Sequence, residues 1–244
     1  MIYNYEEKTR SHSNYFQHNL LSEDGKYKEL TKIEFSQKKQ TKGERFTTFV
    51  TSLSVKINIK TDNEKLKRDI YIRICEDLLS SYDSELVDIN YSMNGITLIF
   101  LTPYKEDIVE VYNDATLFNT ILIMFAKLAL KHNKLVIEHS ISMHSYQVNL
   151  FTIGKSSVGL HLLSPIDSIF SENLAENVLL KKNGKIALSK VSYSNVIDLL
   201  KSTNEEYLQW IVKAYDRVLN NEYYICDVVR SLFSEYLDRN IQEL

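Results

Sequence analysis

The dipeptide formed by Asn94 and Gly95 is the feature of this sequence that most constrains its fold. It stands between two runs of strand-forming residues, 86–91 and 96–100. Asn-Gly in such a place is a strong β-hairpin signal, because a type I′ turn needs positive φ at both central residues. The sequence therefore predicts a hairpin over residues 85–102, with Asn94 and Gly95 as its turn.

A strand and a helix are predicted before this hairpin. Apolar and polar residues alternate over residues 46–60, which is the period of a half-buried strand. Asp62 or Asn63 can then cap a helix. The apolar residues of this helix recur at every fourth position, as on one face of an amphipathic helix, and are Leu66, Ile70, Ile74 and Leu78.

A second long helix is predicted over residues 106–131, and its apolar residues recur at spacings of three and four. Residues 135–143 and 146–153 then predict two more strands that turn near Ser145. The order β-α-β-β-α-β, with one strand added, indicates an α+β fold with a ferredoxin-like core, an antiparallel sheet in the order 4-1-3-2 and helices on one face. In that order the end of the first strand, at Asn58, lies beside the start of the third.

After residue 154 the pattern is less regular. We expect a short helix within residues 160–182, with Asp167 or Ser168 as its cap, a strand over 184–189 and a short helix over 193–200. Apolar spacing further on predicts an amphipathic C-terminal helix, with the residues Ile225, Val228, Val229, Leu232, Phe233, Tyr236 and Leu237.

The predicted organisation has three parts. They are a polar lead-in over residues 1–43, an α+β domain over 44–200, and a C-terminal helical segment over 201–244 that packs on the same domain.

The lead-in carries a basic stretch over residues 26–45. Such a stretch can touch nucleic acid or an acidic partner, but a solvated linker with an early helix or strand is the favoured interpretation. His12 and His18 are accordingly predicted to be solvated. The tyrosines of the lead-in could stack on bases, and packing of their rings is favoured instead; they are Tyr3, Tyr5, Tyr15 and Tyr27.

Composition excludes several classes of function. The chain of 244 residues has 6 glycines and 2 prolines, and it contains no glycine-rich phosphate-binding motif. A net charge of −3 gives no reason to expect a nucleic-acid partner. Cys75 and Cys226 lie far apart, which favours buried thiols in a reducing compartment.

No membrane partner is expected. The first residues lack a basic segment followed by an apolar one, so no signal peptide is predicted. The most apolar stretch, residues 117–130, contains Lys127 and is shorter than the ~20 residues that span a bilayer. We therefore expect a buried helix in a cytoplasmic protein.

Glu138, His139 and His144 form the one cluster that suggests a metal site built on histidine. A separation of five along a strand directs the two rings to opposite faces of the sheet. They are therefore not expected to share an ion.

Four segments carry a resemblance to a known family: residues 54–60, 91–100, 185–193 and 223–229. Their order resembles the class III nucleotide cyclase domain and, within it, the bacterial pyrimidine cyclases of Pycsar antiphage systems. The resemblance covers residues 46–237. It implies a homodimer, because the family builds its sites between two subunits, and a nucleoside triphosphate as ligand.

The resemblance also implies a degenerate metal site. In the family two aspartates hold two divalent ions, and this sequence has Asn58 and Asn94 at those positions. Hard cations prefer anionic oxygen ligands, so Mg²⁺ or Mn²⁺ is expected only if cyclase activity is retained. Asp62 and Asp88 are near in sequence, but neither falls at a matching position.

The remaining predicted nucleotide-binding residues are Ile59, Gly95 and Asn173. The family commonly has an asparagine and, four residues on, a cation that steadies the transferring phosphate. Asn173 matches the asparagine, while Asn177 stands where the cation is expected.

Three functions from different classes follow from these observations. The leading one is a pseudo-cyclase that binds a nucleotide or a protein partner in a signalling or antiphage context. The second is an active cyclase that makes a 3′,5′-cyclic pyrimidine nucleotide. The third is a structural or interaction protein without a nucleotide pocket.

Overall fold

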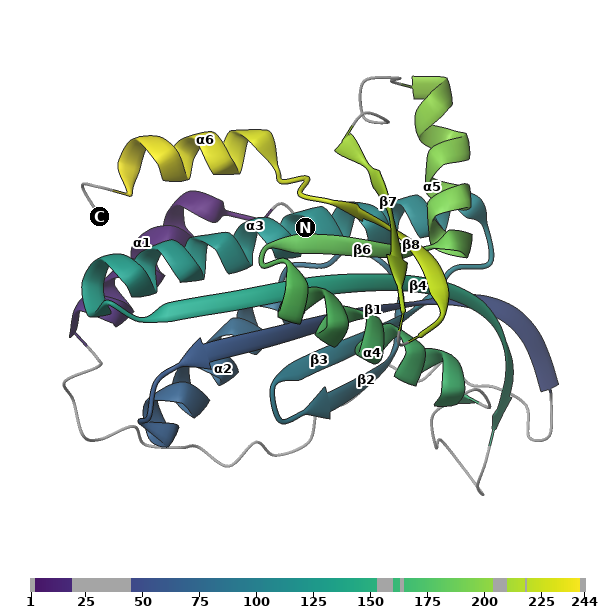
Figure 1. Cartoon of the computed structure of the whole chain (residues 1–244), viewed down its shortest axis with the longest axis horizontal. Coiled ribbons are helices and arrows are strands. Elements are labelled where there is room, and N and C mark those ends of the chain that lie inside the picture. Colours follow the sequence, from purple (N-terminus) through teal and green to yellow (C-terminus); the bar gives the residue numbers. More distant parts are fainter. Residues whose placement is uncertain are drawn as a thin grey trace.

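A single mixed β-sheet with helices on both faces is the centre of the fold in the computed structural model (Figure 1). The structure describes residues 3–18, 45–152, 160–162, 165–203, 210–217 and 219–241. The helices are α1 (Tyr5–His18), α2 (Glu64–Leu79), α3 (Lys105–Asn133), α4 (Pro165–Lys181), α5 (Lys190–Thr203) and α6 (Ser231–Asn240). The strands are β1 (Arg45–Lys60), β2 (Leu86–Ser92), β3 (Gly95–Leu101), β4 (Val136–Thr152), β5 (Leu160–Leu162), β6 (Lys185–Ser189), β7 (Val212–Asp216) and β8 (Asn221–Cys226).

The strand order confirms the predicted ferredoxin-like core. The sheet runs β2-β3-β1-β4-β6-β8-β7, and β5 pairs with β4. Its first four members are antiparallel neighbours with β1 and β3 in the middle. The C-terminal extension adds β6, which is parallel to β4, and then β8 and β7.

The two faces of β1 differ in polarity. The odd-numbered residues Leu53, Val55 and Ile57 are buried in the main core. Helices α2 and α3 supply the other side of that core with the residues Ile70, Ile74, Leu78, Phe118, Leu122 and Phe125. Even-numbered residues of β1 face the other way, and α4 packs against them: the Ser54 hydroxyl donates to Ser171 Oγ at 3.0 Å. Helices thus lie on both faces, whereas only one covered face was predicted.

The predicted break near Ser145 is wrong, because β4 is one strand of 17 residues. It pairs with β1 from Arg45 to Lys60 without a shift in register. Ser145 lies inside this ladder, where its hydroxyl is 2.9 Å from that of Thr51 and 3.0 Å from that of Ser192. Neither glycine nor proline occurs in residues 136–152 to end the strand.

The predicted cap of α2 is confirmed, whereas the predicted caps of α4 are wrong. Asn63 is the cap of α2, and its side chain accepts a hydrogen bond from the N–H of Leu66 at 3.1 Å. Helix α4 begins at Pro165, so Asp167 and Ser168 lie within its first turn and do not precede it. Proline suits the first position of a helix because its missing N–H has no partner there.

Within the predicted C-terminal helical segment 201–244, the described α-helical residues are the end of α5, up to Thr203, and α6 from Ser231 onward. Between these helices, β7 and β8 pair as antiparallel neighbours, with Asn220 at φ 49° just before β8. The apolar spacing was misread here because Ile225 belongs to β8, while Phe233 and Leu237 belong to α6 and are buried. The predicted apolar series spans two elements of different period, a strand and a helix.

Helix α1 is the largest departure from the predicted lead-in. It packs on α3, and Phe16 is buried in the main core. The predicted ring packing is confirmed, since Tyr3 and Tyr5 lie against Phe233 with centroids 5.8 and 5.0 Å apart. Tyr27 lies outside the described residues.

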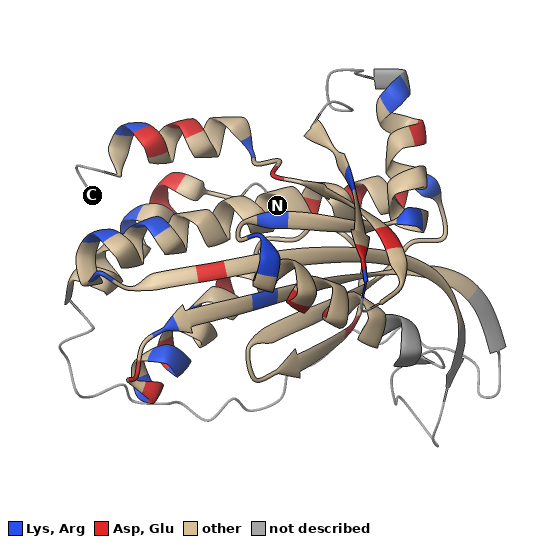
Figure 2. Ribbon diagram, in the orientation of Figure 1, with Lys and Arg blue, Asp and Glu red and all other residues tan. Residues whose placement is uncertain are grey.

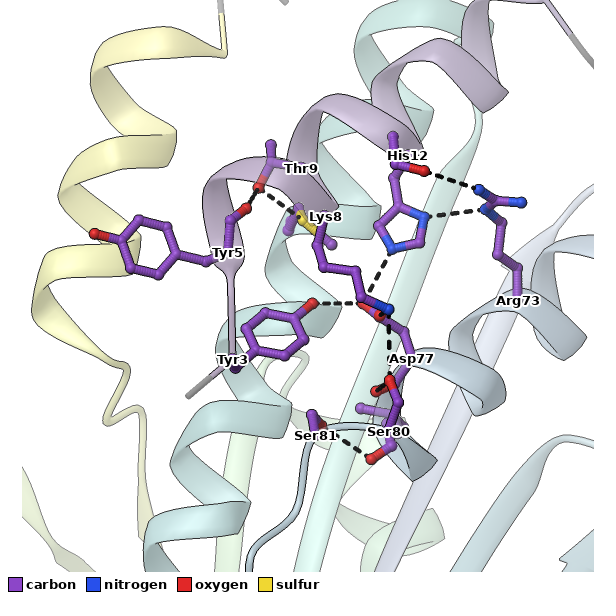
Figure 3. Close-up of polar contacts among 12 residues, drawn as sticks. Tyr3, Tyr5, Lys8, Thr9, His12, Arg73, Asp77, Ser80 and Ser81 are labelled. Carbon is purple, nitrogen blue, oxygen red and sulfur yellow. Dashed lines mark hydrogen bonds and ion pairs between the residues drawn. The ribbon is translucent and has the colours of Figure 1, made fainter. Parts of the chain in front are cut away.

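His12 is buried, not solvated as predicted, because Asp77 of α2 lies opposite it (Figure 3). The Asp77 carboxylate is 3.0 Å from His12 Nε2 and accepts from Tyr3 Oη at 2.5 Å and Lys8 Nζ at 2.6 Å. Burial alone would raise the pKa of Asp77, but these partners, His12 foremost, lower it below its usual value. The side chain of His18 is outside the described part of the chain.

Helix α3 is long and apolar enough to cross a bilayer, and the described residues contain no other such helix. In its most apolar window, 72% of the residues are buried inside the protein. It is therefore the buried core helix that the sequence predicts. Cys75 and Cys226 are buried and free, which agrees with their predicted state.

Replacing Asp77 with asparagine is expected to lower the free energy of unfolding at pH 7 by about 3 kcal/mol, because polar partners from α1 lose a buried charge. The pKa of folded Asp77 is lowered, so its contribution is complete above the unfolded pKa of about 4 and is lost as pH falls through the folded pKa. Urea unfolding at several pH values measures this. Below pH ~4, the free energy of unfolding of the wild type should decrease more steeply with falling pH than that of the variant.

A matched control is Asp238→Asn, which breaks the exposed pair with Lys127. Its effect should stay below ~1 kcal/mol. If both variants gave the same small loss and the same dependence on pH, the Asp77 network would not be what holds α1.

Candidate functional site

The end of β1 and the β2–β3 hairpin meet as the topology predicts. Lys56 of β1 pairs with Gly95 of β3. The N–H of Ile57 donates to the carbonyl oxygen of Asn94 at 2.8 Å. Asn58 and Asn94 therefore lie at the same end of two adjacent strands.

The hairpin is confirmed, but its turn lies one residue earlier than predicted. Ser92 pairs with Gly95, which leaves Met93 and Asn94 as the two turn residues. Neither Asn94 nor Gly95 is among the residues with positive φ. The type I′ turn at Asn94 and Gly95 is thus wrong.

Gly95 is required for a different reason, which is the close approach of β1. A Cβ atom at Gly95 would lie 2.5 Å from the carbonyl oxygen of Val55 and 2.7 Å from Lys56 Cδ. Tyr71 of α2 holds the hairpin from the core side by donating to the Gly95 carbonyl at 2.6 Å. Burial raises the pKa of Tyr71, which keeps its hydroxyl protonated as a donor.

We expect Gly95→Ala to destabilise the protein by about 2–3 kcal/mol, because the added methyl group overlaps a backbone oxygen that cannot rotate away. Chemical denaturation gives the value. Met93→Ala is the control, since Met93 is fully exposed in the same hairpin and should change stability by less than ~0.5 kcal/mol. A Gly95→Ala variant as stable as this control would mean that the two strands are farther apart.

The side chain of Asn58 is directed along the sheet toward β4. Its Nδ2 donates to Glu138 Oε2 at 3.0 Å, and Lys60 Nζ donates to Glu138 Oε1 at 2.5 Å. The bond from Lys60, and then that from Asn58, lower the pKa of Glu138. Asn94 is exposed in the turn, whereas the side chain of Ile59 is buried in the core.

Helix α4 places its residues over the same strands. The carboxylate of Glu172 accepts a hydrogen bond from Thr97 Oγ1 at 3.3 Å. Asn173, the next residue, is exposed on the helix, and Asn177 is half-buried. The predicted site residues therefore share one region of the fold, while Asn58 faces Glu138 and Ile59 faces the core.

Lys56 is the residue of this region that the sequence did not single out. Its side chain is 6% exposed, and its ammonium lies 3.1 Å from Ser92 Oγ and 3.8 Å from Glu172 Oε2. Buried hydroxyl groups of Ser54 and Thr97 are hydrogen-bonded to each other on the same face at 2.8 Å. Lys56 sits at a polar position of an alternating strand, where the pattern by itself predicts a side chain on the polar face.

The donors at this strand end do not fit a pair of divalent cations. Asn58 and Asn94 offer neutral amide oxygens, and Lys56 brings a positive charge to the hairpin. Asp88 accepts from the N–H of Ile89 in β2 at 2.8 Å. Within the described ranges, no group of three or more His, Cys, Asp or Glu side chains could hold a metal ion.

The two histidines of β4 lie on opposite faces, as their spacing predicts. His139 faces the core, where its Nε2 is 2.9 Å from Asn119 Oδ1 and burial lowers its pKa to about 4. His144 stacks on Tyr146 and packs against Phe170 of α4. They cannot bind one ion together.

Among the residues that the structure describes, charge is distributed without a large region of one sign. Figure 2 shows acidic and basic residues interspersed along the helices, while most of the sheet carries neither. The one charge buried on the α4 side of β1 is that of Lys56, among the residues the structure describes.

No protein-family model matches the sequence. A uridylate cyclase from Treponema porcinum is 25% identical over 238 residues, which cover 91% of this chain and 78% of that protein. Among solved structures, a bacterial light-regulated adenylyl cyclase aligns with a TM-score of 0.49 and 14% identity, over 80% of this chain and 98% of the other. The adenylyl cyclase CyaB from P. aeruginosa gives 0.45 and 15%, over 77% and 96%. The chain is thus similar in sequence to a nucleotide cyclase over most of its length.

Proposed function

We propose that this protein is a nucleotide cyclase-like protein that binds a nucleoside triphosphate without cyclising it. The observation that carries the proposal is the set of groups where β1 meets the hairpin. Two neutral amides, Asn58 and Asn94, and one buried ammonium, Lys56, stand there. The nearby carboxylates of Glu138 and Glu172 are each paired with a lysine, Lys60 and Lys56 respectively.

The physical reason is electrostatic. Two metal ions a few ångströms apart need anionic ligands to offset their charge. An amide oxygen carries no net charge, and a lysine ammonium repels a divalent cation at short range. A triphosphate is anionic, so the same groups favour its binding without a metal.

The relative named as a uridylate cyclase suggests uridine triphosphate as the first nucleotide to test. The wider setting is proposed on the resemblance alone. It comprises a homodimer in the cytoplasm that acts in signalling or antiphage defence, with the nucleotide or a protein partner as the bound species.

An active cyclase is the second candidate, and the similarity to the uridylate cyclase favours it. Its reaction would form a 3′,5′-cyclic nucleotide and release pyrophosphate, with Mg²⁺ or Mn²⁺ supplied from solution. Residues outside the sequence pattern of the family would then have to hold the ion.

Incubation with each of the four ribonucleoside triphosphates separates the two candidates. We expect no cyclic product above a buffer blank with Mg²⁺ or Mn²⁺, as measured by chromatography and mass spectrometry. We also expect one triphosphate to raise the melting temperature in EDTA, because a ligand that binds only the folded state stabilises it. Cyclic product would contradict the proposal, and no thermal shift with any triphosphate would favour the structural alternative.

Restoring the two carboxylates provides an independent test of the alignment. The double variant Asn58→Asp with Asn94→Asp is expected to bind Mn²⁺ at least about tenfold more tightly than the wild type, since anionic oxygens replace neutral ones. Titration of the protein with Mn²⁺, followed by the electron paramagnetic resonance of free Mn²⁺, gives the affinity. Asn113→Asp is the control, because it adds a carboxylate at an exposed position of α3, outside the predicted site. Equal affinities in both variants would count against the site.

A further inference from the structure

Lys56 is an unusual residue for the middle of a sheet face. It is 5% exposed, and lysine is almost never this buried unless it is paired. Moving an ammonium out of water is unfavourable by several kcal/mol unless good hydrogen bonds and an opposite charge compensate for it. The partners of the Lys56 ammonium therefore show whether the fold itself compensates the charge or leaves it able to bind a ligand.

Those partners leave the ammonium only partly satisfied. A lysine ammonium has three N–H donors. In the described part of the chain, Lys56 Nζ has one hydrogen-bond acceptor, Ser92 Oγ at 3.1 Å, and one carboxylate, Glu172 at 3.8 Å. A charge-assisted hydrogen bond is normally 2.7–2.9 Å long, so the pair with Glu172 is loose.

A second lysine on the same strand, Lys60, forms a short ion pair and serves as a comparison. Lys60 donates to Glu138 at 2.5 Å, although its side chain is 54% exposed. The more buried lysine thus has the weaker ion pair. A buried cation without a close anionic partner can bind a ligand that supplies the missing negative charge.

We propose that Lys56 and Ser92 bind a phosphate group of a nucleoside triphosphate, with the Lys56 ammonium as the fixed cation. This inference rests on the proposed function and names the group that makes metal-free binding possible. The Ser92 hydroxyl accepts from Lys56 and donates to the Gly95 carbonyl at 3.1 Å. The hairpin therefore holds Ser92 in position beside the ammonium.

Glu172 occupies the place of the anion when no ligand is present. Its side chain is 30% exposed, so a ligand can reach it from solvent. It also accepts from Thr97 at 3.3 Å, a weak bond that is easily exchanged. A phosphate that approaches Lys56 displaces the Glu172 carboxylate into water.

The test measures binding of UTP in EDTA by calorimetry, with inorganic tripolyphosphate and uridine as further probes. Lys56→Met removes the charge and keeps an unbranched side chain that is one atom shorter. It should weaken the binding of UTP and of tripolyphosphate at least about tenfold. Glu172→Gln removes the competing anion and should increase the affinity for UTP and for tripolyphosphate about threefold or more. Lys60→Met is the matched control, with the same charge removed four residues along the strand, and should change the affinity less than about twofold.

Opposite effects of Lys56→Met and Glu172→Gln support the inference, because a general loss of folding would weaken binding in both. Lys56→Arg keeps the charge and should retain most of the affinity. If Lys56→Met does not fold, as judged by its melting without ligand, the affinity of Glu172→Gln for UTP tests the proposal. An unchanged or lower affinity in that variant overturns the proposal.

The probes distinguish the role of Lys56 from the proposed function. UTP affinity that is equal in the wild type and in Lys56→Met overturns the role of Lys56 and leaves the proposed function intact. Binding of tripolyphosphate but of no nucleotide, lost in Lys56→Met, supports the anion site and contradicts the proposed function. Binding of none of these anions overturns both.

Discussion

The pairing of β1 with both β3 and β4 sets the position of every residue considered at the site. Sixteen residues of β1 pair with β4, and seven pair with β3. Successive side chains of a strand point to opposite faces, so a shift by one residue would exchange the polar and apolar faces. The register is fixed beside the hairpin by Gly95, which lets β1 approach, and by Tyr71, which binds the hairpin from the core.

The buried charges of Asp77 and Lys56 are compensated to different degrees. On the α2 side, Asp77 has Tyr3, Lys8 and His12 as partners within 3.0 Å, and these bonds fasten α1 to the domain. On the α4 side, Lys56 has one hydrogen bond and a distant carboxylate. The first charge is compensated by the fold itself. The second is compensated only in part, which is why a ligand is inferred for it and not for Asp77.

Local pattern and topology predicted the hairpin, the α2 and α3 helices, and the meeting of Asn58 with Asn94, because each depends on residues close in sequence or on strand order. Features set by distant contacts were missed. The turn lies one residue earlier than predicted. Glycine is needed at position 95 for the close approach of β1 and not for a positive φ. Helix α1 packs on the domain where His12 meets Asp77, and α4 covers Lys56. The periodicity of the sequence around His12 and Lys56 indicates neither contact.

Small hydroxyl residues explain how α4 comes close enough to reach Lys56. Ser140 and Ser142 of β4 donate to backbone carbonyls of α4 at 2.5 Å, and Ser54 of β1 donates to Ser171. These contacts hold the helix independently of Glu172, which adds only the loose pair with Lys56 and one long hydrogen bond. An anion that replaces Glu172 therefore leaves α4 docked. The helix can present a competing carboxylate to the site without the fold depending on it.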